Sequence, residues 1–109
     1  LYGDQVLRDT ANILKASFRD TDIIGRIVGD EFMILIKNIE SENIIAHKVS
    51  RVLRYINTVH NITASVGIAI YPKDGDTFEE LYHNADLAMY KAKSQRKNRF
   101  VFYDRSISD

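Results

Sequence analysis

The chain has 109 residues, 45% of them hydrophobic and 28% charged, a composition that suits one ordinary globular domain with a small core. Fifteen basic residues balance fifteen acidic ones, so the net charge gives no general attraction for nucleic acid or an anionic membrane. Cysteine is absent, which excludes disulfides, thiolate metal sites and cysteine nucleophiles, and no apolar run approaches the roughly 20 residues of a membrane span.

The first half of the chain predicts a helix, a hairpin and a second helix. A helix over roughly residues 3 to 19 is predicted by apolar residues at helical spacing: Leu7, Ala11, Leu14 and Phe18. Residues 23–28 and the apolar run 32–36 predict two strands joined by a tight turn at Gly29-Asp30. Ser41 is then expected to cap a second helix, on which the same spacing recurs: Ile45, Val49, Val52 and Ile56.

The second half predicts a strand, a helix and a last strand. Apolar residues alternate over residues 62–70 and predict a strand that ends in a turn at 71–75. Thr77 and Glu80 form a capping box for a third helix, which is expected to end near Gln95 before a strand at 99–103. This order of elements predicts an α+β fold with a mainly antiparallel central sheet flanked by helices.

Two adjacent acids, Asp30 and Glu31, stand at the tip of the predicted hairpin. A carboxylate at an exposed turn is a good ligand for Mg²⁺, which prefers oxygen and usually shares its ligands with substrate phosphates. Gly29 would allow a phosphate to approach the backbone closely. The alternative is a solvated turn, which is what most Gly-Asp-Glu tripeptides between strands are.

Four separated segments, in matching order and spacing, resemble one known family. They are G-D-x-x-L at 3–7, R-x-V-G-D-E-F at 26–32, A-S-V-G-I-A at 64–69, and A-D-x-A-M-Y-x-A-K at 85–93 followed by N-R at 98–99. The family that they resemble is the GGDEF family of diguanylate cyclases. The resemblance implies a ferredoxin-like, nucleotidyl-cyclase palm fold, of which residues 1–109 would be the C-terminal two thirds of an N-terminally truncated domain.

The resemblance implies a metal and nucleotide role for the hairpin. Asp30 would bind Mg²⁺ (or Mn²⁺) near the attacking 3′-hydroxyl, and Glu31 would support a second metal or orient the ligands of the first. Gly29 would let the backbone approach the phosphates. Two metal-binding carboxylates and nearby cations are the smallest set of protein groups that this reaction requires, because phosphoryl transfer needs chiefly in-line positioning and charge neutralisation.

Further nucleotide contacts are implied outside the hairpin. Asp4 would accept hydrogen bonds from guanine, and Lys93 and Lys97 would hold the β- and γ-phosphates. Simpler interpretations stay open: Asp4 also suits the positive end of a helix dipole, and lysines also suit a solvated helix C-terminus.

A second nucleotide site is implied by Arg19 and Asp22, an R-x-x-D element that ends five residues before the signature. In the family this element resembles the inhibitory site that binds the product, cyclic di-GMP. An arginine fork can bond guanine O6 and N7 or a phosphate, and an aspartate can accept from guanine N1 and N2. The alternative is a helix-to-strand turn, which favours both residue types.

Three departures from the family pattern are visible. Val28 replaces the first signature glycine, which makes the loop stiffer, and Arg96 stands where a glycine is usual. Lys97 replaces an arginine, exchanging a bidentate fork for a point charge. The strand that precedes Gly3 in the family, with an aspartate of the metal site and an asparagine that reads guanine, is absent from this chain.

The sequence therefore predicts a diguanylate cyclase domain that acts as a homodimer on two GTP molecules in bacterial second-messenger signalling. Its expected location is the cytoplasm, either in a cytoplasmic protein or in the cytoplasmic part of a membrane-anchored one. No nucleic acid and no direct membrane contact are expected. Sensory or EAL phosphodiesterase domains are the expected neighbours. Two alternatives remain: a catalytically degenerate domain that binds GTP or cyclic di-GMP and regulates an attached domain, and an unrelated ferredoxin-like interaction domain. His47, His60 and His83 lack metal-ligand spacing and are interpreted as incidental.

Overall fold

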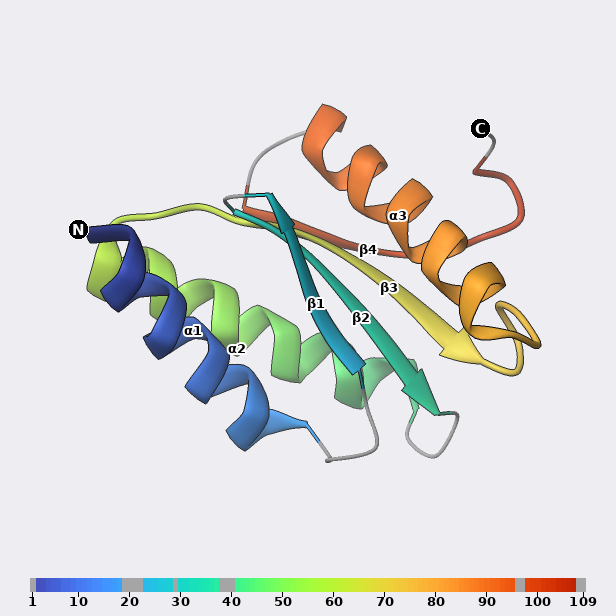
Figure 1. Ribbon diagram of the computed structural model, residues 1–109, viewed down its shortest axis with the longest axis horizontal. Helices are drawn as coiled ribbons and strands as arrows, with labels where there is room; N and C mark the ends of the chain where they lie inside the picture. The colour runs from blue at the N-terminus through green and yellow to red at the C-terminus, as the bar shows by residue number, and fades with distance from the viewer. Residues whose placement is uncertain (1, 19–22, 29, 38–40, 96–97, 108–109) are drawn as a thin grey trace.

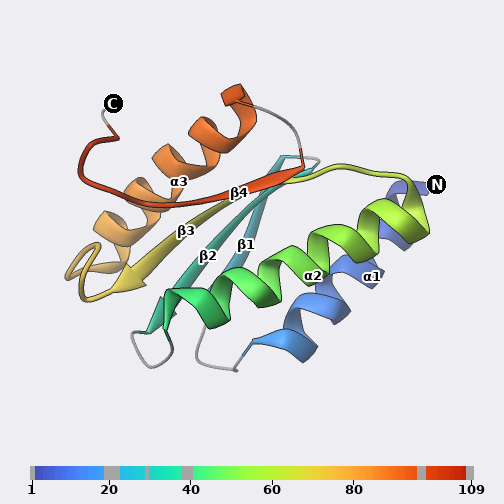
Figure 2. The same cartoon turned by 180° about the vertical axis from the view of Figure 1, so that it is seen from behind.

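Three helices pack on the two faces of one four-stranded sheet (Figure 1, Figure 2). The computed structural model describes residues 2–18, 23–28, 30–37, 41–95 and 98–107, and of residues 2–4, 7, 11, 23–24 and 26–28 it describes the backbone alone. The elements in chain order are α1 (Tyr2–Ser17), β1 (Ile23–Val28), β2 (Glu31–Lys37), α2 (Glu42–His60), β3 (Ser65–Tyr71), α3 (Phe78–Gln95) and β4 (Arg99–Phe102). α1 and α2 cover one face of the sheet, and α3 covers the other.

The predicted helix starts are confirmed by their capping bonds. The Ser41 hydroxyl accepts a hydrogen bond from the Ile44 N–H at 3.3 Å at the start of α2. Before α3, the Thr77 hydroxyl accepts from the Glu80 N–H at 3.1 Å, and a Glu80 carboxylate oxygen accepts from the Thr77 N–H at 3.3 Å. The predicted first helix is also present, and it ends at Ser17, two residues earlier than expected.

The predicted strands are also present, but the expectation of a mainly antiparallel sheet is wrong. The sheet order is β1-β2-β3-β4; β1 and β2 pair antiparallel, whereas β2 with β3 and β3 with β4 pair parallel. The physical reason lies in the connections. A tight turn joins β1 to β2, but α2 separates β2 from β3 and α3 separates β3 from β4, and a helical crossover returns the chain to run in the same direction.

The alternating side chains of the strands fill two cores. Even-numbered residues of β2 and β3 face α1 and α2, and odd-numbered residues of β2 with Ala69 of β3 face α3. The larger core consists of Leu14, Phe18, Phe32, Ile34, Ile36, Ile45, Val49, Val52, Leu53, Ile56, Ala64, Val66, Ile68 and Ile70. The smaller core consists of Met33, Leu35, Ala69, Leu81, Ala85 and Met89. This alternation fixes which polar side chains at the strand ends lie under α3.

A polar cluster joins α1 to α2 and corrects the interpretation of His60 as incidental. One carboxylate oxygen of Asp9 accepts a hydrogen bond from the Tyr55 hydroxyl at 2.8 Å and lies 2.7 Å from the Nε2 atom of His60. The rings of Tyr55 and His60 meet edge to face, with 6.4 Å between centroids. These bonds, to His60 first and Tyr55 second, lower the pKa of Asp9 below its usual value.

Substituting Asp9→Asn is expected to lower the stability of the domain at neutral pH, and to lower it by a smaller amount in acid. Because the folded state lowers the pKa of Asp9, its carboxylate stabilises the fold above the unfolded pKa of about 3.9, and this contribution is lost as pH falls through the lower folded value. Urea midpoints of both proteins, measured from pH 7 to pH 3, should therefore converge in acid. A constant difference across that range would contradict the assigned role.

Candidate functional site

The acidic turn is fixed to the sheet by its backbone. Asp30 occupies the turn before β2, and its carbonyl oxygen accepts a hydrogen bond from the Ser65 N–H of β3 at 3.0 Å. Glu31 is the first residue of β2, and the β1–β2 register shifts between Arg26 and Val28, just before it. Such an irregularity re-aims side chains at a strand end, as bulges beside functional sites do. Asp30 is half-buried and Glu31 is 8% exposed.

The side chain of Glu31 lies on the α3 face of the sheet and contacts that helix. Lys93, in the last turn of α3, donates a hydrogen bond from Nζ to Oε2 of Glu31. The carboxylate is 10% exposed and the lysine side chain 50% exposed, so the ion pair lies at the rim of the helix–sheet contact. The hydrogen bond to Glu31, helped by the charges of Glu31 and Asp30, raises the pKa of Lys93 above its usual value.

Two further polar residues share this edge of the sheet, and the sequence did not single them out for a site. In the strand register, Glu31 is paired with Ser65 of β3, and Ser65 is paired with Arg99 of β4. The Arg99 guanidinium donates to the Gln95 side chain of α3 at 2.8 Å. Ser65 is 3% exposed, and Arg99 is the first residue of the strand that the sequence predicts at 99–103. Only strand register brings them level with Glu31.

The structure therefore brings together three of the eight residues to which the sequence assigns a site role: Asp30, Glu31 and Lys93. Asp4 lies in the first turn of α1, and its side chain is outside the described atoms. The remaining four residues lie outside the described part of the chain: Arg19, Asp22, Gly29 and Lys97.

The donor set at the turn fits a magnesium ion that shares its ligands with phosphates. Within the described residues no group of three or more His, Cys, Asp or Glu side chains is placed to hold a metal. Asp30 and Glu31 nevertheless supply two adjacent carboxylates, and Mg²⁺ commonly takes one or two carboxylates, keeping its other positions for water and substrate phosphate oxygens. The residues present therefore suit Mg²⁺, or Mn²⁺ with its similar preference for oxygen, with nucleotide bound.

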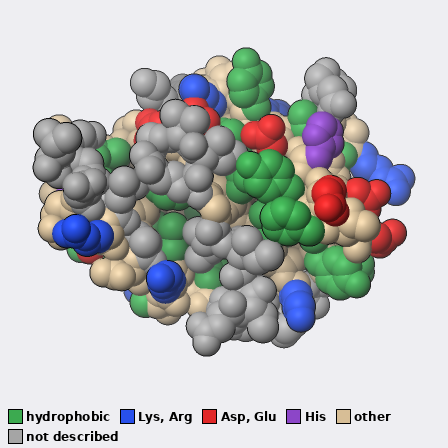
Figure 3. Space-filling model, viewed as in Figure 1, with side chains coloured by type: hydrophobic (Ala, Val, Ile, Leu, Met, Phe, Trp, Pro, Cys, Tyr) green, Lys and Arg blue, Asp and Glu red, His purple; other side chains and the backbone are tan. Residues whose placement is uncertain are grey.

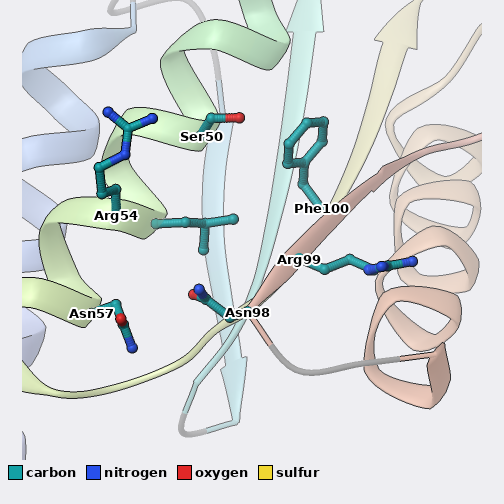
Figure 4. Close-up of a pocket in the computed structure, with 7 residues that line it drawn as sticks. Ser50, Arg54, Asn57, Asn98, Arg99 and Phe100 are labelled. Carbon is teal, nitrogen blue, oxygen red and sulfur yellow. The ribbon is translucent and has the colours of Figure 1, made fainter.

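A pocket of about 510 Å³ opens on the other face of the sheet, between α2 and the start of β4 (Figure 4). Among the described residues, its lining is mostly polar and includes no carboxylate: Ser50, Leu53, Arg54, Asn57, Asn98, Arg99 and Phe100. The Arg99 side chain leaves this pocket toward α3, consistent with its bond to Gln95. The pocket and the acidic turn are therefore separate features on opposite faces.

Exposed aromatic residues lie toward both ends of α3: Phe78 and Tyr82 in its first turns, and Tyr90, 70% exposed, three residues before Lys93. Phe78 and Tyr82 are 52% and 42% exposed, with ring centroids 5.8 Å apart. Figure 3 shows hydrophobic side chains gathered in the half of this face where α3 begins. None of the described helices is both long and apolar enough to cross a lipid bilayer.

Comparison with known proteins identifies the family. Residues 1–99 match the family described as diguanylate cyclase, GGDEF domain. The chain is 38% identical, over 97% of its length, to the bifunctional diguanylate cyclase/cyclic di-GMP phosphodiesterase MucR of Pseudomonas aeruginosa. It is 31% identical, over 96% of its length, to the cyclic di-GMP phosphodiesterase NbdA of the same organism. It spans 16% and 14% of the lengths of these two relatives.

A solved structure agrees with the sequence comparison. The EAL/GGDEF domain protein from M. capsulatus superposes with a TM-score of 0.70 at 36% identity, over 93% of this chain and 70% of that one. The likeness thus extends from the signature turn to the packing of helices on the sheet. The chain belongs to the GGDEF domain family of diguanylate cyclases.

Proposed function

We propose that this domain condenses two GTP molecules into cyclic di-GMP and two pyrophosphates in bacterial second-messenger signalling. The observation that carries the proposal is the placement of Lys93 against the Asp30–Glu31 turn, which puts two carboxylates and a cation at one end of the sheet. A cleft for a magnesium nucleotide needs both signs of charge within a few ångströms.

Each residue has a proposed part in the reaction. Asp30 and Glu31 hold Mg²⁺ or Mn²⁺, which supplies charge neutralisation at the phosphates and lowers the pKa of the attacking hydroxyl. Lys93 and Lys97 bind the β- and γ-phosphates, and their positive charge stabilises the pyrophosphate that leaves. Gly29 gives the phosphates close access to the backbone.

The chemistry requires two copies of the domain. Each domain holds one GTP, with Asp4 accepting hydrogen bonds from guanine, and the 3′-hydroxyl of each nucleotide attacks the α-phosphate of the other. A homodimer that meets head to head places both nucleotides for this exchange. We propose a cytoplasmic location, where GTP is present, and an EAL phosphodiesterase or sensory domain as a neighbour, as the bifunctional name of the relative MucR suggests.

The experiment that tests the proposal is incubation of the intact protein with GTP and Mg²⁺, followed by chromatography of the nucleotides. Cyclic di-GMP and pyrophosphate in a 1:2 ratio are expected. The second candidate is a domain that binds nucleotide without turnover, favoured by the branched Val28 in place of the first signature glycine and by the relative NbdA, named as a phosphodiesterase. Nucleotide binding in calorimetry without product would favour this second candidate.

Substituting Arg19→Ala is expected to weaken cyclic di-GMP binding about tenfold or more, because one bidentate, charge-assisted contact is lost. GTP affinity should not change, since the proposal gives Arg19 and Asp22 a part in binding the dinucleotide product and none in binding GTP. Calorimetry with each nucleotide makes the measurement, and Arg8→Ala on the exposed surface of α1 is the matched control. Unchanged affinity for the dinucleotide would remove the inhibitory-site assignment.

A further inference from the structure

The ion pair between Lys93 and Glu31 joins two residues that the proposed function assigns to different ligands. The Glu31 carboxylate is 10% exposed, and a buried carboxylate is costly unless a cation or several hydrogen bonds compensate its charge. In the structure Lys93 supplies that compensation directly, through a hydrogen bond from Nζ to Oε2. The reaction, in contrast, needs Glu31 on the metal and Lys93 on the phosphates.

We infer that the Lys93 ammonium is a stand-in cation for Glu31, which a divalent metal must displace, and that its release supplies the cation that the nucleotide phosphates require. The inference rests on the proposed function, because it takes Glu31 as a metal ligand and Lys93 as a phosphate contact. It adds that the metal and the nucleotide separate this ion pair between them: the metal takes Glu31 and the phosphates take Lys93. The two ligands therefore do not fill separate, preformed sites.

The surroundings of Lys93 suit such an exchange. Its side chain is 50% exposed, and it lies in the last turn of α3, two residues before the helix ends at Gln95. Four rotatable methylenes allow the ammonium to move between partners while the helix backbone stays in place. Arg99, the cation in register on β4, instead donates to the neutral Gln95 side chain, so it does not compensate Glu31 in the same way.

The exchange couples the two ligands. Metal alone must break the ion pair and leave the ammonium without a partner, and nucleotide alone must take the lysine and leave the buried carboxylate uncompensated. When both bind, each takes one half of the pair, so metal and nucleotide raise one another's affinity by the same factor. Lys93 therefore keeps the ligand-free site from holding a divalent ion tightly.

Removing the stand-in cation should improve metal binding in the absence of nucleotide. Lys93→Met keeps an unbranched, flexible side chain that is one atom shorter, and removes its charge. We expect the intact Lys93→Met protein to bind Mn²⁺ about tenfold more tightly than wild type, the effect of removing one competing charge-assisted hydrogen bond. Titration of free Mn²⁺ by electron paramagnetic resonance, without nucleotide, makes the measurement. Lys91→Met removes the same charge two residues away and should match wild type.

A double variant locates the effect. Adding Glu31→Gln to Lys93→Met should abolish the gain, because the carboxylate that receives the metal is then absent. Equal or weaker Mn²⁺ affinity in Lys93→Met, absence of Mn²⁺ binding in both proteins, or a gain that survives Glu31→Gln would each overturn the inference. The proposed function is tested by a separate result. A gain in Mn²⁺ affinity in Lys93→Met, without cyclic di-GMP synthesis by the wild type, contradicts catalysis alone. Synthesis by the wild type, without a gain in Mn²⁺ affinity in Lys93→Met, contradicts the displacement of Lys93 alone.

Discussion

Asp30→Asn is expected to reduce the proposed cyclic di-GMP synthesis by about a thousandfold or more, since the loss of a carboxylate proposed to bind the metal would remove several kcal/mol of transition-state stabilisation. Asparagine keeps the size of the side chain and removes the negative charge that a hard cation requires. The backbone carbonyl of Asp30, which accepts the hydrogen bond from Ser65, is unchanged, so the turn should keep its place in the sheet. Initial rates of product formation at saturating GTP and Mg²⁺ make the measurement.

The control for this substitution is Asp76→Asn, which removes the same charge from an exposed turn at the other end of α3. Its activity should equal that of wild type. Asp30→Asn should also weaken the binding of magnesium GTP. Calorimetry measures this binding, so the two variants can be compared even if the domain binds nucleotide without turnover. An Asp30→Asn protein that keeps more than about a tenth of wild-type activity would show that this carboxylate is not a metal ligand, given the size of such effects.

Gly67→Ala is expected to destabilise the domain by about 3 kcal/mol, at the upper end of overpacking effects. An added Cβ atom would lie 2.1 Å from the carbonyl oxygen of Ala85 and 2.4 Å from the backbone nitrogen of Met89. Both are backbone atoms of α3, so no side chain can turn aside, and the whole helix must move away from β3. For a domain of this size the melting temperature should fall by about 10–20 °C, which thermal and urea unfolding can measure.

Gly25→Ala is the matched control, because nothing lies within 4 Å of a Cβ atom placed there. That substitution should leave stability within about 0.5 kcal/mol of wild type. Since α3 also carries Lys93, any Gly67→Ala protein that stays folded should lose the alignment of this lysine with Glu31. Equal melting temperatures for the two glycine variants would contradict the close helix–sheet contact.

The sequence predicted the elements well because hydrophobic periodicity and capping boxes are local. Ser41 and Thr77 cap the helices as expected, and both helix starts follow from side-chain bonds within three residues. Strand direction was predicted wrongly, because the apolar runs of β2 and β3 look the same in either direction. A helix between two strands can cover the sheet or carry the chain across to a parallel strand, and the helical connections of this chain are crossovers.

In the candidate site, too, the residues could be predicted from local sequence but the contacts between them could not. The resemblance named Glu31 and Lys93, but their mutual contact spans 62 residues of sequence and depends on how α3 lies across the sheet. The contact of His60 with Asp9 could not be predicted from the sequence for the same reason, because 51 residues separate them. Spacing rules detect partners within one element, whereas contacts between elements require the register and the packing of the whole domain.

The hydrogen bond from the Ser65 N–H to the Asp30 carbonyl bears on how much the signature can vary. It ties Asp30 to β3, and the pairing of Val28 with Glu31 ties the next acid to β1, so both neighbouring strands fix the backbone of the two acids. A branched residue, Val28, therefore stands at the entrance of the turn while the backbone of both acids stays paired with a neighbouring strand.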